Sequence, residues 1–165
     1  FEIKAAAYDN LINHTLNNVI YEAAVKVPEV EYTKEEQEFV RELVKSVTGQ
    51  EPDFEPLETK VKKPTGVEST VGGSTDVGDP SYNIPTAQFR GQVRPNGVPG
   101  HHWNTTALCK HSIGHKGQMN GGQVLAQAGY DLLKNPSLVD AAWAEFNKSM
   151  ETRAPYHCWL DDIEE

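Results

Sequence analysis

The chain has 165 residues, about the size of one domain, and its hydrophobic fraction of 38% is enough to form a folded core. Its 15 lysines and arginines against 24 aspartates and glutamates give a net charge of −9. That balance excludes a general nucleic-acid binder, because phosphate binding needs clustered cations. No run approaches the roughly 18 apolar residues of a membrane span, so we expect no membrane segment.

The cysteines and the first residues of the chain indicate where the protein is located and whether the chain is part of a longer protein. Cys109 and Cys158 are too few for a disulfide-dense scaffold, so we interpret them as reduced residues of a cytoplasmic protein. The chain begins at Phe1 and lacks the basic and apolar regions of a secretory leader. We therefore expect it to be part of a longer protein.

Two helices are predicted in the first third of the chain. Apolar residues recur at three- and four-residue intervals over residues 15–27, and Pro28 ends this pattern. A second helix is predicted to begin at Thr33, where Glu36 completes a capping box, and to end at Gly49. Residues 50–66 contain three prolines and are predicted to form a surface loop.

The middle of the chain has a different composition. Over residues 67–99, glycine, serine, threonine and proline separate short stretches, such as 86–93, that are predicted to be strands. Helical periodicity returns near Gln118 and predicts one helix ending at Lys134 and another running from Ser137 to Met150. Strands between helix pairs favour an α/β fold with a small or incomplete sheet.

One long segment is free of acidic residues. There is no aspartate or glutamate between Asp79 and Asp131, although the whole chain is acidic. The same segment contains four histidines and several cations, namely His101, His102, His111, His115, Arg90, Arg94, Lys110 and Lys116. Such a segment can hold a carboxylate or give neutral imidazoles to a metal ion. The alternative is that these side chains are solvated or cap helices.

Individual residues of this region are candidates for a site. His101 and His102 follow a Pro-Gly pair, and only one imidazole is expected to enter a given cavity if they lie on a strand. His115 and Lys116 stand near the predicted start of a helix, where an anion can bind. Asp76 or Asp79 could orient a histidine at a metal, or either could be an ordinary turn residue. A phosphate-binding loop is disfavoured, because the glycine spacing is wrong.

Five ordered blocks carry a resemblance to a known family. They lie at residues 73–79, 84–88, 101–104, 112–117 and 155–158. Together they resemble the C-terminal half of the B-subunit group of aminobenzoyl-glutamate hydrolases, with the likeness running from Tyr8 to Cys158. These are amidohydrolases of the zinc-peptidase superfamily, which also contains carboxypeptidase G, aminoacylases and plant auxin-conjugate hydrolases.

The resemblance implies a fold and a domain organisation. We expect an α/β chain forming part of a three-layer αβα zinc-peptidase-like catalytic domain. Residues 1–28 would be the end of a lid or dimerisation domain, and residues 33–165 the C-terminal portion of the catalytic domain. The implied function is metal-dependent hydrolysis of an amide bond next to a free carboxylate, of the aminobenzoyl-glutamate or N-acyl amino acid type. The substrate would be a small molecule or a peptide.

The resemblance also implies roles for particular residues. His101 matches the single histidine of the family's His-x-Trp block and would be a metal ligand, with His102 as the second choice. Asp76, His102, His115 and Lys116 would bind substrate or support the site.

The other ligands of the two divalent ions, expected to be zinc, would precede Phe1. We therefore expect the chain alone to be inactive and metal-poor, and to form a homodimer or associate with the missing N-terminal half. The alternative is a non-catalytic binding or assembly module derived from the same fold.

Overall fold

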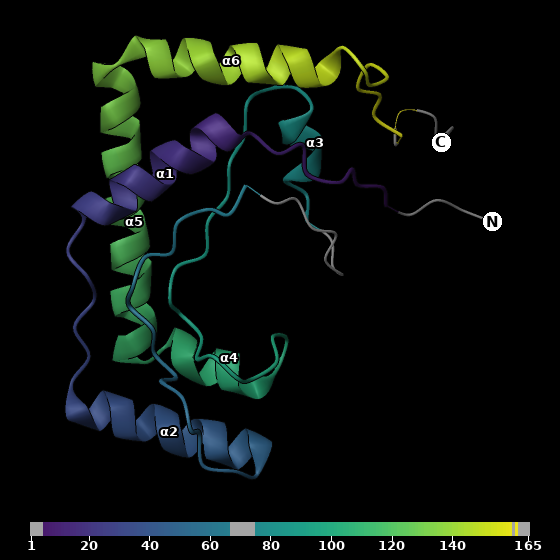
Figure 1. Cartoon of the computed structure of the whole chain (residues 1–165). Helices are drawn as coiled ribbons and strands as arrows, with labels where there is room; N and C mark the ends of the chain where they lie inside the picture. The colour runs from purple at the N-terminus through teal and green to yellow at the C-terminus, as the bar shows by residue number, and fades with distance from the viewer. Residues whose placement is uncertain (1–4, 67–74, 160, 162–165) are drawn as a thin grey trace. The chain divides into compact units, whose positions relative to one another are not determined.

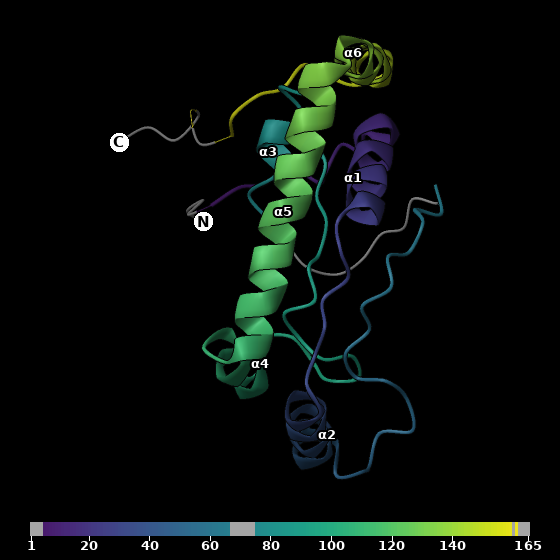
Figure 2. The ribbon, with the colours of Figure 1, turned by 90° about the vertical axis from the view of Figure 1, so that its left-hand side faces the viewer.

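The computed structural model describes residues 5–66, 75–159 and 161, and within them all regular secondary structure is helical. Figures 1 and 2 show these helices without a strand among the described residues. In chain order they are α1 (His14–Lys26), α2 (Lys34–Thr48), α3 (Gly78–Ser81), α4 (Trp103–Cys109), α5 (Ser112–Lys134) and α6 (Pro136–Met150). The expectation of an α/β fold with three αβα layers is therefore wrong.

The predicted strand at residues 86–93 shows why. A strand needs a neighbouring strand to pair with its backbone, and the polar groups of this segment bond to nearby residues and to single side chains instead. The amide of Val93 donates to the carbonyl of Gly91 over 3.0 Å, and the Gln92 side chain donates to the carbonyl of Arg94 over 2.6 Å. The segment is irregular, and the first part of the predicted strand region, residues 67–74, lies outside the described residues.

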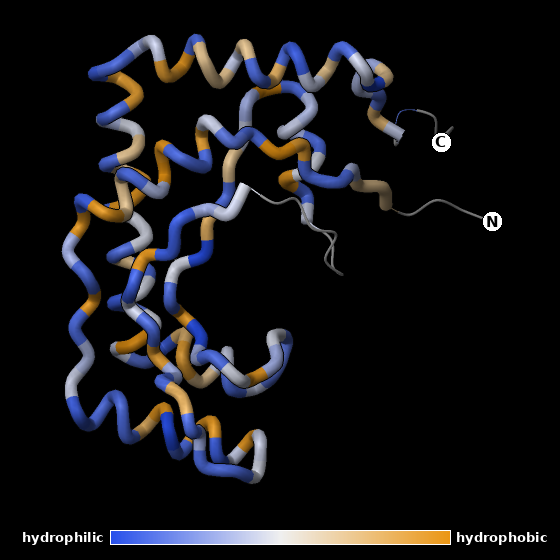
Figure 3. The backbone as a smooth tube through the Cα atoms, viewed as in Figure 1, coloured by the Kyte–Doolittle hydropathy of each residue, from blue (hydrophilic) through white to orange (hydrophobic). Residues whose placement is uncertain are grey.

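The predicted capping box and end of the second helix are confirmed in α2. The Thr33 hydroxyl accepts from the Glu36 amide, the Glu36 carboxylate accepts from the Thr33 amide, and Gly49 ends the helix with φ 76°. Figure 3 shows hydrophobic residues recurring among hydrophilic ones along this helix. The predicted helices at 15–27 and 137–150 are also confirmed within a residue. The helix predicted near Gln118 begins earlier, at Ser112.

The chain divides into two compact units, each built from separate stretches of sequence. Unit 1 contains Phe1–Glu22, Lys63–Phe89 and Tyr130–Glu165, and unit 2 contains Ala23–Lys62 and Arg90–Gly129. The assignment of residues 1–28 to a lid and 33–165 to a catalytic portion stays a prediction. None of the described helices is long and apolar enough to cross a membrane.

Unit 2 has the larger apolar core. It is formed by side chains from α2, α4, α5, the loop after α2 and the loop before α4, with less than a tenth of their surface exposed: Val40, Leu43, Val44, Leu57, Val98, Leu108 and Ile113. Tyr32, Phe39 and Val47 pack against this cluster. Leu108 and Ile113 are completely buried, which fixes α4 and the start of α5 on α2.

Unit 1 is held by polar contacts to the start of α1. The Glu145 carboxylate of α6 accepts from the amides of His14 and Thr15 over 2.7 and 2.9 Å. It thus caps amides that have no partner within α1. At Gly78 a Cβ atom would collide with the carbonyl oxygen of Tyr8, so glycine is needed for this close approach.

Candidate functional site

The two adjacent histidines lie at the entry to α4 in unit 2. His101 has φ 52°, a left-handed conformation that is uncommon for a residue other than glycine, and its side chain is exposed. His102 is the N-cap residue of α4 and is partly buried. Its Nδ1 lies 2.8 Å from Oδ1 of Asn104, which is completely buried. His101 is therefore the more accessible imidazole, and His102 is the one held by a neighbour.

A cation that the sequence analysis did not assign to the site lies beside this turn. A Cβ atom at Gly100 would collide with Nη1 of Arg94, so the Arg94 guanidinium lies against the residue before His101. Arg94 has no acidic partner among the described residues. The signal was present in the sequence, because Arg94 belongs to the acid-free segment, but nothing in the local pattern set it apart from Arg90.

Lys116 forms an ion pair within unit 2. Its ammonium donates to the Glu36 carboxylate over 2.7 Å and to the carbonyl of Glu31 over 2.9 Å. It also stands 5.7 Å from the centre of the Tyr32 ring. Glu36 is 6% exposed and further accepts a hydrogen bond from the Ser112 hydroxyl. The charge of Lys116 is thus balanced, and its predicted role in substrate binding stays a prediction.

The environment of Glu36 favours its charged form. Burial by itself raises the pKa of the Glu36 carboxyl, but the hydrogen bonds from Lys116, Ser112 and the Thr33 backbone outweigh it. The net result lowers the pKa of Glu36 to about 2. Glu36 is therefore an anionic anchor for Lys116 at neutral pH and not a general base.

The block at residues 112–117 has a clear packing role. Ser112 begins α5, and a Cβ atom at Gly114 would collide with the carbonyl of Leu108. At Gly117 it would collide with the carbonyl of Gln92. The two glycines therefore let α5 approach neighbouring backbone closely. His115, between them in sequence, is exposed, and its predicted functional role stays a prediction.

The acidic block lies in unit 1. Asp76 is exposed, whereas Asp79 has two partners from distant parts of the chain. The hydroxyl of Tyr156 donates to Asp79 Oδ1 over 2.9 Å, and the amide of Tyr8 lies 3.4 Å from Oδ2. The hydrogen bond to Asp79, with a smaller contribution from burial, raises the pKa of Tyr156 to about 12. Asp79 thus joins the first and last blocks of the resemblance.

The candidate residues do not form one cluster within either unit. His101, His102, His115 and Lys116 belong to unit 2, and Asp76 belongs to unit 1. Among the described residues, no three His, Cys, Asp or Glu side chains are grouped so that they could hold a metal ion. The donor set of the described chain does not fit a complete divalent-metal centre.

Comparison with known proteins relates the chain to one part of a hydrolase. It is 25% identical over 170 residues to the B subunit of p-aminobenzoyl-glutamate hydrolase from Escherichia coli (strain K12). The match covers 90% of this chain and 35% of that protein, so the chain spans about a third of its relative's length. The resemblance inferred from the sequence blocks is therefore confirmed. No family model matches the chain, and no solved structure matches it significantly.

Proposed function

We propose that the chain is part of an amidohydrolase that cleaves an amide bond next to a free carboxylate, of the p-aminobenzoyl-glutamate or N-acyl amino acid type. The observation that carries this proposal is the similarity to the B subunit of p-aminobenzoyl-glutamate hydrolase over 90% of the chain. The acid-free, histidine-rich segment supports it, because a carboxylate substrate needs cations without competing acids.

Arg94 is the residue to which we assign the substrate carboxylate. Its guanidinium lies against Gly100, next to the two histidines, and no described acidic side chain neutralises it. A guanidinium can bind a carboxylate through two parallel hydrogen bonds. Lys116, by contrast, already faces Glu36. We propose that Lys116 supports the site by holding the start of α5 on α2, and that Arg94 makes the ionic contact.

His101 is proposed as one donor to a divalent metal, with zinc as the expected ion. Its exposure and its left-handed backbone at the entry to α4 fit a donor that meets ligands from elsewhere. A bound divalent ion would supply polarisation of the amide carbonyl. His102 and His115, which lie in the same unit as His101, keep their proposed supporting roles near the substrate, and Asp76, in unit 1, keeps a proposed supporting role of its own.

The experiment uses the protein encoded by the complete reading frame that contains this chain. We expect it to hydrolyse p-aminobenzoyl-glutamate and to contain zinc by elemental analysis. His101→Ala should reduce both zinc content and activity about 100-fold or more, whereas His14→Ala should keep both near wild type. Wild-type zinc and activity in both variants, or no hydrolysis by the wild-type protein, would overturn the proposal.

A second candidate is a binding or assembly module without catalysis of its own. Exposed apolar side chains on α5, such as Met119 at 68% and Leu133 at 83% exposure, are consistent with association. Light scattering of the 165-residue chain tests it: a homodimer or a complex with another hydrolase segment supports the module, and a monomer that binds neither contradicts it.

A further inference from the structure

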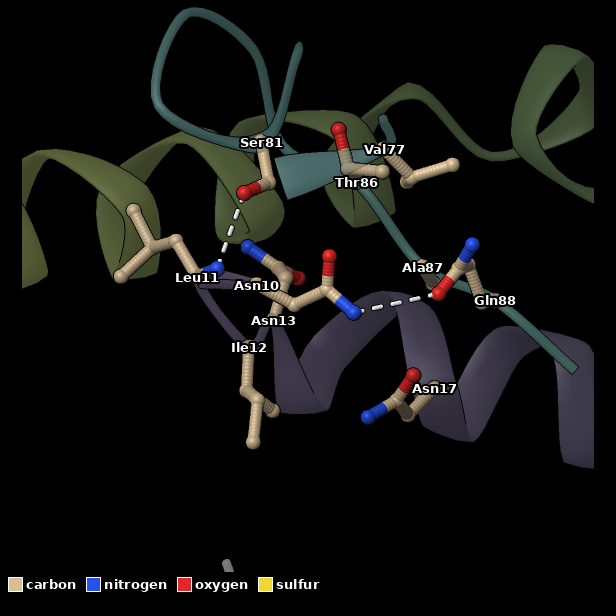
Figure 4. Close-up of a pocket in the computed structure, with 10 residues that line it drawn as sticks. All are labelled: Asn10, Leu11, Ile12, Asn13, Asn17, Val77, Ser81, Thr86, Ala87 and Gln88. Carbon is tan, nitrogen blue, oxygen red and sulfur yellow. Dashed lines mark hydrogen bonds between the residues drawn. The ribbon is translucent and has the colours of Figure 1, made fainter. Parts of the chain in front are cut away.

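Unit 1 contains a pocket to which no role has yet been assigned. It has a volume of about 200 Å³ and lies between the start of α1 and two later stretches of the chain. Figure 4 shows side chains from residues 10–17, from α3 with Val77 before it, and from residues 86–88 around the space. Val77 and residues 86–88 belong to two of the five sequence blocks, so the fold brings these blocks together here.

The wall of the pocket is polar but uncharged. Its polar side chains are carboxamides and hydroxyls, and no charged residue is among those that line it in the described chain. Leu11, Ile12, Val77 and Ala87 supply apolar surface beside them. A carboxylate or an ammonium group would meet no opposite charge among the lining residues, so any water that it gives up on entering would not be replaced by an ionic contact. The pocket therefore selects for an uncharged ligand.

Some of the polar groups are already used by the fold. The Ser81 hydroxyl accepts from the amide of Leu11 and donates to the carbonyl of Gly78. The Asn13 side chain donates to the carbonyl of Ala142 over 2.9 Å and accepts from the amide of Leu16. These two side chains are buried and hold the floor of the pocket in place.

Other polar groups keep hydrogen-bonding capacity. Asn10 donates to Gln88 Oε1 over 3.2 Å, which leaves Asn10 Oδ1 as an acceptor and the Gln88 amide nitrogen as a donor (Figure 4). The Asn17 carboxamide lines the same pocket, and the described residues give it no partner. Donors and acceptors thus stand side by side, which is the pattern that a carboxamide of a ligand would match.

We infer that this pocket binds a small uncharged ligand with a carboxamide attached to an apolar or aromatic body. The carboxamide bonds to Asn17 and Gln88, and the body packs on Ile12 and Val77. This inference does not require the proposed hydrolase activity, because none of the residues given roles in that proposal lines the pocket. Benzamide is a suitable probe, and benzoate has the same shape with a negative charge.

The test is titration of the ¹⁵N-labelled 165-residue chain with each probe, followed by two-dimensional NMR. Benzamide should shift the amide signals of residues 10–17, 77–79, 81 and 86–88, and benzoate should bind at least about tenfold more weakly. Gln88→Leu and Asn17→Leu should each weaken benzamide binding about fivefold or more. Gln118→Leu, an exposed change on α5, should leave the affinity unchanged.

Several outcomes would overturn the inference. They are an absence of shifts in these residues at saturating benzamide, equal affinity for benzamide and benzoate, and unchanged affinity in both pocket variants. Gln88 is exposed and lies outside the helices, so Gln88→Leu is expected to fold even if Asn17→Leu does not. The spectrum of each variant reports its folding directly. Loss of hydrolase activity in the longer protein would not affect this result.

Discussion

Lys116 at the start of α5 donates to the carboxylate of Glu36 at the start of α2 over 2.7 Å. The same carboxylate closes the capping box with Thr33. One buried anion therefore serves both the end of its own helix and the contact with a helix 80 residues later in the chain. A substitution that removes only one partner is therefore expected to lower the free energy of unfolding by more than the loss of a surface ion pair does.

Stability at acid pH should report on Glu36. Because its folded pKa, about 2, is below the ordinary value of 4.5, its contribution is present above pH 4.5 and is lost as the pH falls towards 2. The expected loss in the free energy of unfolding is about 3 kcal/mol over that window. Urea unfolding of wild type and Glu36→Gln at several pH values measures it. Glu38→Gln, at an exposed position of α2, is the control and should retain the wild-type pH dependence.

Two glycines of α5 should respond oppositely to the same substitution. Gly117→Ala should lower the free energy of unfolding by about 1–3 kcal/mol, because its Cβ would collide with the carbonyl of Gln92. At Gly122 a Cβ would meet nothing within 4 Å. Gly122→Ala should therefore raise stability by up to about 1 kcal/mol, since alanine favours the helix. Thermal and urea unfolding measure both, and equal effects would contradict this account of α5 packing.

The cap on α1 is formed by Glu145, a residue of α6 that lies far from α1 in the sequence. Glu145→Ala should lower the free energy of unfolding by about 1–2 kcal/mol, because the amides of His14 and Thr15 lose their acceptor. Glu151→Ala changes an exposed carboxylate just after α6 and should have little effect. Hydrogen exchange of the first amides of α1 should accelerate only in Glu145→Ala. Unchanged exchange in that variant would mean that the carboxylate does not cap the helix.

Kinetics of the longer protein, which we propose to be a hydrolase, should distinguish Arg94 from its neighbours. If the Arg94 guanidinium binds the substrate carboxylate, Arg94→Ala should raise KM about tenfold or more with a smaller change in kcat. Arg90→Ala removes an exposed cation of the same acid-free segment and should leave KM near wild type. With a substrate that has a carboxamide in place of the carboxylate, wild type and Arg94→Ala should have similar KM values. A KM that is insensitive to Arg94→Ala would contradict its assignment.

Local signals determined which parts of the fold could be predicted. The capping box of Thr33 and Glu36 and the stop at Gly49 are contained within α2, so periodicity and capping located that helix. The short helices α3 and α4 were missed, because four and seven residues are too few to establish a period. Strands were predicted at residues 86–93 from composition, although a strand depends on a partner that local sequence cannot supply.

The sequence proposed a set of residue types for the candidate site but did not give their arrangement. The acid-free segment pointed to His101, His102 and Lys116, but only the structure relates Lys116 to Glu36, 80 positions earlier. The same holds for Asp79. The residue pattern left Asp76 and Asp79 as alternatives and the resemblance favoured Asp76, whereas in the structure it is Asp79 that contacts Tyr156. The sequence pattern therefore could not predict contacts between side chains that are far apart in the chain.

The assembly of unit 1 from three stretches of chain has a consequence for biosynthesis. The hydroxyl of Tyr8 donates to the carbonyl of His157, and Asn13 donates to that of Ala142, across separations of 149 and 129 residues. While a ribosome is still extending the nascent polypeptide, α2 can already close its local capping box, but Tyr8 and Asn13 must wait for their acceptors to emerge. Translation pauses before residue 142 should therefore prolong exposure of this half-formed region to chaperones and proteases.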